Sequence, residues 1–384
     1  MKVGLVVEQL DPRRGGVEQW TWQFCSWLLN NGHEVHIVGR GCAAEVANSG
    51  AIVHTVEAGN SRTVFAAALA DKLRTLSLDV VHDTGCGWHC DVLQPHGGSR
   101  AASFEQNLLL SPNWLRPLKR HATSWLPRYR EFDELTRRQY HDPRKLFMAI
   151  SKMVAHDLMH YHHVSPGQVR LVYNGVDTTR FSPAHRVAHR AEVRERLKVA
   201  DHETLLLIVA HNFRLKGVST LVRATGRLIR AGHAVRLAVV GGRRFAPYER
   251  LAAKHGCRDA VQFLGSLGDP VPMYAAADVY VQPTYYDPCS LVLLEAIASG
   301  LPVITSRFNG AGELLTPGVE GDIIDDPGND EELAASLSPL MDANCRAKMG
   351  LAARRLALDH TLEHNSREVV AVYEEVVHSR RRAA

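Results

Sequence analysis

Two segments in the second half of the chain place charged side chains where a phosphate-bearing ligand could be bound. The first segment, HNFRLKG, directly follows the apolar run TLLLIVA and contains Arg214 and Lys216. Two cations in a loop at the carboxyl end of a buried strand could neutralise a diphosphate leaving group. Taken alone, the pair is better interpreted as two solvated surface cations.

The second segment, YYDPCSLVLLEAIASGLPVIT, resembles the start of a helix with either Asp287 or Ser290 as its N-cap. The N–H groups of Leu291 and Val292 would then be free to bind phosphate oxygens, and Glu295 could accept both hydroxyls of a ribose. The alternative is that Asp287 only caps the helix and Glu295 is solvated. We favour a functional Glu295 because it lies in the apolar run LVLLEAIA, where an unpaired carboxylate is costly.

The first half of the chain offers two weaker signals. Gly15 and Gly16 follow a strand-like run and open a helix-like one, so a ligand could approach the backbone and the helix start closely. His96 stands in QPHGGS, where two glycines behind the imidazole also permit close approach. No Gly-x-Gly-x-x-Gly follows a strand-like run, which argues against a dinucleotide cofactor.

A cluster of potential metal ligands, HDTGCGWHC, is interpreted as a polar loop at the end of a strand. Its ligand types suit zinc, but its spacing fits no common zinc pattern and no second pair stands nearby. We therefore expect no metal and no other cofactor. The residues concerned are His82, Asp83, Cys86, His89 and Cys90.

Short apolar runs alternate with helix-length segments, which predicts an α/β chain with two Rossmann-like halves in tandem. The turn-rich stretch NGVDTTRFSPAHR is the best candidate for the junction. We expect a first domain over 1–175, a second over 176–360 and a C-terminal helix over 361–384 that returns to the first domain. The expected strands are KVGLVV, EVHIVG, AIVHTV, DVVHD, DVLQPH, LFMAI and VRLVYN, then TLLLIVA, VRLAVV, VQFLG, DVYVQP, PVITS and GDIID.

Composition excludes several classes of protein. The formal net charge of +4 is too weak a bias to argue for nucleic acid. No apolar run reaches the roughly 18 residues that a membrane span needs, and the amino terminus reads as a buried strand rather than a signal peptide. Seven irregularly spaced cysteines indicate reduced thiols and a cytoplasmic protein.

Residues 111–130 break the alternation, because this segment combines cations with tryptophan and leucine and contains no acid. Such a mixture suits a peripheral contact with an anionic membrane surface. The alternative is a solvated helical hairpin at the edge of a domain, since three prolines exclude one continuous amphipathic helix. The residues in question are Arg116, Lys119, Arg120, Arg128 and Arg130, with Trp114, Leu115, Trp125 and Leu126.

The early Gly-Gly, the NGVD junction, Arg-x-Lys, and Asp-x7-Glu followed by AIASGLPVI together resemble the retaining GT-B glycosyltransferases of group 1. That group includes lipopolysaccharide core glucosyltransferases, mannosyltransferases and sucrose-type synthases, and the first of these is the nearest in character. The resemblance covers nearly the whole chain and is most specific in the second half. It implies a GT-B fold, with two Rossmann-like domains facing across a cleft.

The resemblance also implies roles for single residues. Gly15 and Gly16 match the loop that meets the donor phosphates, Arg214 and Lys216 match the cations on the diphosphate, and His96 matches the histidine near the anomeric carbon. The matches in the donor-binding helix are Leu291 and Val292 as backbone donors and Glu295 as the ribose-binding acid. A loop that these enzymes often place near the donor contains Asn309, Gly310 and Glu313.

One position departs from the pattern, because the family usually has Glu where this chain has Asp287. The side chain is one methylene shorter and reaches roughly 1.5 Å less. A carboxylate that binds sugar hydroxyls tolerates this change if the backbone shifts, with a consequence for the preferred donor sugar.

The expected reaction is a metal-independent, front-face transfer of a hexose from a nucleotide sugar, with a UDP-sugar favoured, to a glycan or glycolipid acceptor. Such a step belongs to lipopolysaccharide or cell-surface polysaccharide synthesis. Two alternatives stay open: a sugar-nucleotide 2-epimerase on the same scaffold, and a non-catalytic protein that binds nucleotide sugars.

Overall fold

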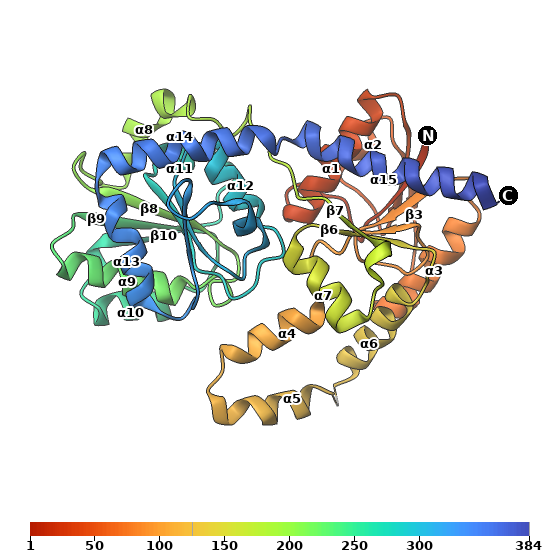
Figure 1. Cartoon of the computed structure of the whole chain (residues 1–384), viewed down its shortest axis with the longest axis horizontal. Helices are drawn as coiled ribbons and strands as arrows, with labels where there is room; N and C mark the ends of the chain where they lie inside the picture. The colour runs from red at the N-terminus through yellow and green to blue at the C-terminus, as the bar shows by residue number, and fades with distance from the viewer. Residues whose placement is uncertain (125, 384) are drawn as a thin grey trace. The chain divides into compact units, whose positions relative to one another are not determined.

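The chain folds into two compact units (Figure 1). The computed structural model describes the backbone of residues 1–124 and 126–383, and the side chains of these residues except 122–124, 127, 128 and 383. Unit 1 comprises Met1–Tyr173 together with Leu362–Ala384, and unit 2 comprises Asn174–Thr361. The chain thus crosses from one unit to the other at the predicted junction and returns at its last helix.

Unit 1 is built on a seven-stranded sheet in the order β3-β2-β1-β4-β5-β6-β7, with every neighbouring pair parallel. Its strands are β1 (Lys2–Val6), β2 (Glu34–Gly39), β3 (Ile52–Thr55), β4 (Val80–Asp83), β5 (Val92–Leu93), β6 (Leu146–Ala149) and β7 (Val169–Leu171). Its helices are α1 (Gly16–Asn30), α2 (Ala44–Ala47), α3 (Arg62–Arg74), α4 (Arg100–Leu109), η1 (Asn113–Leu115), α5 (Arg116–Ser124), α6 (Pro127–Tyr140), α7 (Lys152–His162), η2 (Pro166–Gln168) and α15 (Leu362–Ala383).

Unit 2 repeats the plan with six parallel strands in the order β10-β9-β8-β11-β12-β13. Its strands are β8 (Thr204–Val209), β9 (Val235–Val240), β10 (Val261–Gly265), β11 (Val279–Gln282), β12 (Val303–Ser306) and β13 (Gly321–Ile324). Its helices are α8 (His185–Arg196), α9 (Val218–Arg230), α10 (Ala246–Lys254), η3 (Arg258–Ala260), α11 (Val271–Ala276), α12 (Leu291–Ala298), η4 (Gly310–Leu314), α13 (Asp330–Leu337), η5 (Ser338–Met341) and α14 (Ala343–Asp359).

The predicted α/β class with two Rossmann-like halves is confirmed. Central strands such as β8 and β11 are apolar along almost their whole length and buried, because helices cover both faces of a parallel sheet. In each unit the strand order reverses once, between β1 and β4 in unit 1 and between β8 and β11 in unit 2. The loops at the carboxyl ends of these two strand pairs diverge, and a crevice at that point is where such sheets bind ligands.

Helix α15 belongs to unit 1 although it ends the chain. The indole N–H of Trp20 in α1 donates a 2.9 Å hydrogen bond to the side chain of Asn365. The Asn365 amide in turn donates to the carbonyl oxygen of Tyr173, at 2.6 Å. Tyr373, further along α15, is fully buried. These contacts fix the last helix to the core of unit 1.

The basic segment forms η1, α5 and the first turn of α6, which follow α4 in unit 1 (Figure 1). Trp125 falls outside the described residues, as does the side chain of Arg128. In the part of the chain that the structure describes, no helix combines the length and the apolar character that a membrane span requires.

Candidate functional site

The predicted ligand-binding residues of unit 2 lie on loops that leave neighbouring strands. Arg214 and Lys216 lie between β8 and α9, and Asp287 and Ser290 lie between β11 and α12. Because β8 and β11 are hydrogen-bonded neighbours, these two loops start from the same edge of the sheet. They flank the point at which the strand order reverses, so the topology predicts a ligand between them.

A partly buried ion pair joins the two loops. The ammonium of Lys216 lies 2.6 Å from Oδ2 of Asp287 and 3.4 Å from the carbonyl oxygen of Tyr286. The same Oδ2 accepts a 2.9 Å hydrogen bond from the amide of Gln282, which is fully buried at the end of β11. Lys216 is therefore not a solvated surface cation, whereas Arg214 is exposed on the same loop.

Close backbone contact between the loops depends on Gly217. Its φ of +72° is unfavourable for other residues, and a Cβ there would lie 2.0 Å from the carbonyl oxygen of Pro283. Next to this contact, the N–H of Tyr285 donates to the carbonyl oxygen of Leu215 at 2.8 Å, and the Thr284 hydroxyl donates to the same oxygen at 3.2 Å. The glycine thus lets the Lys216 loop lie directly against the Asp287 loop.

Helix α12 begins at Leu291 and its N-cap is Ser290, whose hydroxyl oxygen accepts a 3.4 Å hydrogen bond from the N–H of Leu293. The expectation that Asp287 could be the cap is wrong, because its carboxylate is already engaged with Lys216. Within the described structure, the N–H groups of Leu291 and Val292 donate to no protein acceptor. They are the free donors of a helix start, available to an anion.

Asn309 holds the Asp287 loop from the β12 side. The backbone N–H of Asp287 donates to the carbonyl oxygen of Phe308 at 2.9 Å, and the N–H of Gly310 donates to the carbonyl oxygen of Asp287 at 2.8 Å. The amide oxygen of Asn309 accepts from the N–H of Ser290 at 3.4 Å. Asn309 is almost fully buried, so its contribution in this structure is to shape the loop.

Glu295 is buried in the second turn of α12, as its apolar neighbours predicted. Burial raises the pKa of its carboxyl group to about 7. The carboxyl group has one protein partner in the described structure, because the hydroxyl of Tyr274 donates a 2.8 Å hydrogen bond to Oε2. One tyrosine does not satisfy two carboxylate oxygens, and burial still dominates the pKa.

In unit 1, Gly15 is the N-cap of α1, and no side chain caps that helix. Its φ of 178° is ordinary extended backbone, so the glycine is not required by strain. Gly16 is the first helical residue. As a result, the α1 start presents backbone N–H groups without a capping side chain, which is compatible with phosphate binding.

His96 follows β5 in unit 1 and is buried beside Trp20, with 4.6 Å between the ring centroids. Burial lowers the pKa of its imidazole to about 3, so His96 is neutral at physiological pH. Nearby, Nδ1 of His82 lies 2.6 Å from the hydroxyl of Tyr373. Nε2 of His96 is buried without a hydrogen-bond partner among the described residues, and Nε2 of His82 has none besides a side-chain interaction with Gln94. Such orphaned groups indicate bound water or a polar ligand.

The polar loop after β4 is organised by Asp83, whose carboxylate accepts hydrogen bonds of 2.6–2.7 Å from the N–H groups of Gly85, Cys86 and Gly87. Asp83 thus shapes the loop. No group of three or more potential metal ligands comes together in the described part of the chain.

Two residues of the site were not identified from the sequence. Gln282 links the Asp287 carboxylate to Ser290, because its Oε1 accepts a 2.9 Å hydrogen bond from the Ser290 hydroxyl. A polar residue at the end of the apolar run DVYV is a signal that could have indicated it. Tyr274, the partner of Glu295, lies on another helix and has no comparable signal.

Two family models match the chain and together cover most of it. The model for glycosyl transferases group 1 matches residues 189–356, and the model for glycosyltransferase family 4 matches residues 14–180. The boundary between the matches falls close to the boundary between the two structural units.

Three known proteins illustrate the similarity. D-inositol 3-phosphate glycosyltransferase of Salinispora tropica is 33% identical over 246 residues, which are 60% of this chain and 51% of that protein. Lipopolysaccharide glucosyltransferase WaaG of Escherichia coli K12 is 30% identical over 209 residues, which are 54% of this chain and 56% of that protein. A crystal structure of WaaG superposes with a TM-score of 0.80 at 22% identity and covers 97% of this chain and 99% of that one. Anabaena HepE in complex with UDP-glucose gives a TM-score of 0.75 at 16% identity, covering 98% and 100%.

The aligned region spans about half the length of these curated relatives, whereas the fold matches extend over nearly the whole of each solved structure. Both halves of the chain match glycosyltransferase models, and both units have the Rossmann-like architecture. The chain therefore belongs to the group 1 glycosyltransferases of GT-B fold and resembles the lipopolysaccharide core enzymes among them.

Proposed function

We propose that this protein is a retaining, metal-independent glycosyltransferase that moves a hexose from a nucleoside-diphosphate sugar to a glycan or glycolipid acceptor. A UDP-sugar is the favoured donor. The observation that carries the proposal is that Lys216, the Asp287 loop and the free N–H groups at the start of α12 come together where the strand order of unit 2 reverses.

Charge placement supports the diphosphate as the leaving group. Of the three N–H donors of the Lys216 ammonium, one faces Asp287 and one faces the Tyr286 carbonyl oxygen, which leaves one for a phosphate oxygen. The ion pair fixes the ammonium before the ligand arrives, so little reorganisation is needed as negative charge grows on the leaving group. Fixed cations and a helix start would thereby replace a metal ion.

Glu295 supports a donor that contains a nucleoside, and not a simple sugar phosphate. It lies on the helix whose start would hold the phosphates, and Tyr274 is the one hydrogen-bond partner that the described residues give its Oε2. Two ribose hydroxyls donating to the carboxylate would favour its ionised form. Of the relatives, HepE was solved with UDP-glucose, and we extend a UDP-sugar donor to this chain as part of the proposal.

The test begins with donor turnover. UDP-, GDP- and ADP-sugars are incubated with the full chain, with and without EDTA, and nucleoside diphosphate release is measured with water or a glycolipid extract as acceptor. Lys216→Ala is expected to lower turnover about a hundredfold or more, and Lys254→Ala, which removes an exposed lysine at the end of α10, is the matched control.

Each outcome has a defined meaning. Release of UDP with the anomeric configuration retained by NMR supports the proposal, and EDTA should leave the rate unchanged. Interconversion of UDP-sugars without release indicates the epimerase, and binding without any turnover indicates the non-catalytic protein. Near-wild-type turnover of Lys216→Ala would remove the lysine from the mechanism.

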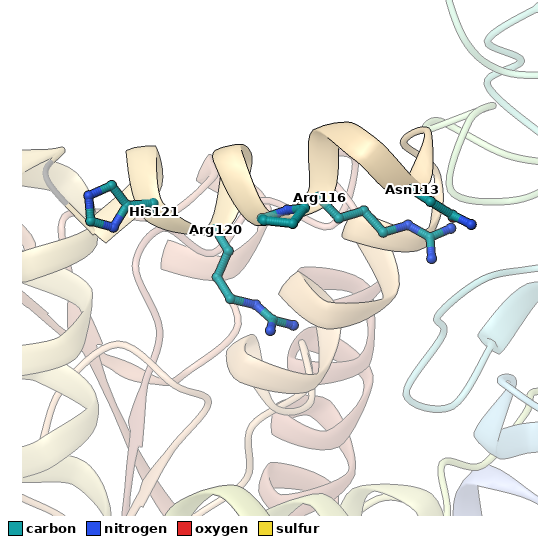
Figure 2. Close-up of a pocket in the computed structure, with 5 residues that line it drawn as sticks. Asn113, Arg116, Arg120 and His121 are labelled. Carbon is teal, nitrogen blue, oxygen red and sulfur yellow. The ribbon is translucent and has the colours of Figure 1, made fainter.

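We also propose that the protein is cytoplasmic and contacts the inner face of the membrane through residues 111–130. Trp114 is 76% exposed and Leu118 is 64% exposed, one helical turn apart on η1 and α5. An open pocket of about 600 Å³ on the same segment is lined by Asn113, Arg116, Pro117, Arg120 and His121 (Figure 2). Exposed apolar side chains beside cations are the pattern of an interfacial helix.

The cations of this segment are partly engaged within the protein. Arg120 forms an ion pair with Glu105, and Lys119 donates a 2.6 Å hydrogen bond to Ser111. Arg116 donates to the carbonyl oxygens of Ser111 and Leu109, at 3.0 and 3.1 Å. We therefore assign the membrane contact chiefly to the exposed apolar residues, with the net positive charge of the segment adding attraction to anionic lipid.

A further inference from the structure

The junction NGVDTTRFSPAHR begins with Asn174, which is also the first residue of unit 2. Its side chain is 3% exposed, and its Nδ2 donates a 3.1 Å hydrogen bond to the carbonyl oxygen of Cys289. Cys289 directly precedes Ser290, the N-cap of α12, and belongs to the Asp287 loop. The first residue of the junction is thus hydrogen-bonded to the loop that leads into the predicted donor-binding helix.

This hydrogen bond engages a carbonyl group that lies outside the helix. The carbonyl oxygen of an N-cap residue accepts the first hydrogen bond within a helix, so the oxygen of the residue before it has no helical donor. In α12 that oxygen belongs to Cys289, and Asn174 supplies the donor. Because this peptide leads directly into the first turn, its orientation helps to set the direction of the free N–H groups of Leu291 and Val292.

The junction is linked to α12 at two further places. The guanidinium of Arg354 in α14 donates to the carbonyl oxygen of Phe181 at 3.0 Å and to that of Ala298, the last residue of α12, at 2.7 Å. The ring of Phe181 also contacts Tyr274 edge to face, with 5.6 Å between the centroids, and Tyr274 is the hydrogen-bond donor to Glu295. The junction therefore supports the helix near its start, at its second turn and at its end.

The oxygen of the Asn174 side chain has no hydrogen-bond partner among the described residues. The orientation of the amide follows from the carbonyl group of Cys289, which can only accept, so Nδ2 faces it and Oδ1 is the unpaired atom. A buried acceptor without a partner costs free energy, and an apolar side chain would avoid that cost. Packing and stability alone therefore do not account for an asparagine at this position.

We propose that Asn174 is a positioning residue for the donor. By holding the Cys289 peptide, it directs the N–H groups of Leu291 and Val292 toward the diphosphate. The inference rests on the proposed function and adds to it a residue that acts through the Asp287 loop. Because negative charge grows on the diphosphate in the transition state, a misdirected helix start should lower kcat by more than it lowers donor affinity.

Calorimetry and turnover of the full chain test this role. UDP-glucose, GDP-glucose and ADP-glucose are titrated into wild type, Asn174→Ala and the isosteric Asn174→Asp, and nucleoside diphosphate release is measured for each protein. Asn329→Ala is the matched control, because Asn329 is the N-cap of α13 in the same unit and accepts hydrogen bonds from the N–H groups of Glu331 and Glu332. Thermal melts report the stability of every variant.

Asn174→Ala is expected to bind the preferred nucleotide sugar about tenfold more weakly at unchanged stoichiometry, and its kcat is expected to fall about a hundredfold. Asn174→Asp keeps the volume of the side chain but cannot donate when it is ionised, so it should lose at least as much. Asn329→Ala should have a lower melting temperature and wild-type affinity and kcat. Unfolding alone would lower the calorimetric stoichiometry and leave the dissociation constant of the folded protein unchanged.

A kcat that stays at the wild-type value in both Asn174 variants would overturn the inference. Losses in Asn329→Ala as large as those in Asn174→Ala would do the same, because they would show that any destabilisation of unit 2 disturbs the donor. If wild type and Asn174→Ala release nucleoside diphosphate equally well, the proposed function stands and Asn174 has no part in it. A wild type that neither binds nor turns over any of the three nucleotide sugars sinks the proposed function, and the role of Asn174 with it.

Discussion

The buried carboxyl group of Glu295 should lower the stability of the ligand-free protein, and Glu295→Gln should remove that loss. Burial raises its pKa from 4.5 to about 7. Each tenfold change in acid dissociation corresponds to about 1.4 kcal/mol, so ionising this group in the native state costs about 3 kcal/mol more than in the unfolded chain. Glutamine has nearly the same shape, keeps an oxygen for the Tyr274 hydroxyl and carries no charge.

The sign of the pH dependence follows from the direction of the shift. Between pH 4.5 and about 7 the native state holds a proton that the unfolded chain has released, so the free energy of unfolding falls as the pH rises through this window. Above about pH 7 the full loss of about 3 kcal/mol is present. The stability of Glu295→Gln relative to wild type should therefore rise from pH 5 to pH 8 by up to that amount.

Urea unfolding at pH 5, 6, 7 and 8 measures this difference, and the chain supplies an internal control. All six tryptophans, Trp20, Trp22, Trp27, Trp88, Trp114 and Trp125, precede residue 126, so tryptophan fluorescence reports on unit 1 alone. Far-ultraviolet circular dichroism reports on both units. The variant should move the transition seen only by dichroism and leave the fluorescence transition in place.

The same substitution should weaken donor binding. If the ribose hydroxyls donate to the ionised carboxylate, the affinity of wild type for UDP-glucose should rise with pH up to about 7, and Glu295→Gln should bind about tenfold or more weakly with a flat pH profile. Calorimetry with UDP-glucose suits this test. A stability difference that is independent of pH, or a variant that binds the donor as well as wild type, would refute the reasoning.

Two further predictions concern the loop contact and the membrane. Gly217→Ala should lower the free energy of unfolding by about 1–2 kcal/mol from the left-handed φ alone, and the contact with Pro283 should lower it further. The variant should also bind UDP-glucose more weakly. Urea unfolding and calorimetry measure the two effects, and an unchanged protein would show that the loops do not require close contact. The double variant Trp114→Ala/Leu118→Ala should lose most of its sedimentation with anionic liposomes while keeping its thermal melt; no wild-type sedimentation at low salt would end the membrane proposal.

The fold could be predicted because its signal is repeated along the whole chain. A parallel sheet buries both faces of each strand, so runs such as TLLLIVA and DVYVQ are continuously apolar and stand apart from the helices between them. Every expected strand occurs in the structure. Because parallel sheets bind ligands at the carboxyl ends of their strands, the sequence also indicated the end at which ligand-binding side chains would lie.

The candidate site was less predictable, because the sequence identifies the loops of the site but not which side chains of different loops contact each other. Lys216 and Asp287 were each identified, yet nothing in their spacing of 71 residues predicts that they form an ion pair. Asp287 was expected to be a possible cap because Asp-Pro is a common helix start; the cap is Ser290, since the carboxylate has a stronger partner in Lys216. Tyr274 could not be foreseen, because only packing brings α11 against α12.

Three unfavourable features of unit 2 lie at one place, and this coincidence is stronger support for a ligand than any of them alone. The N–H groups of Leu291 and Val292 lack acceptors among the described residues, Glu295 is ionised only at a cost, and Lys216 keeps one donor unused. Phosphate oxygens would satisfy the first and third, and ribose hydroxyls the second. A nucleoside diphosphate contains both groups in one molecule, whereas an inorganic anion or a free sugar would leave at least one feature unrelieved.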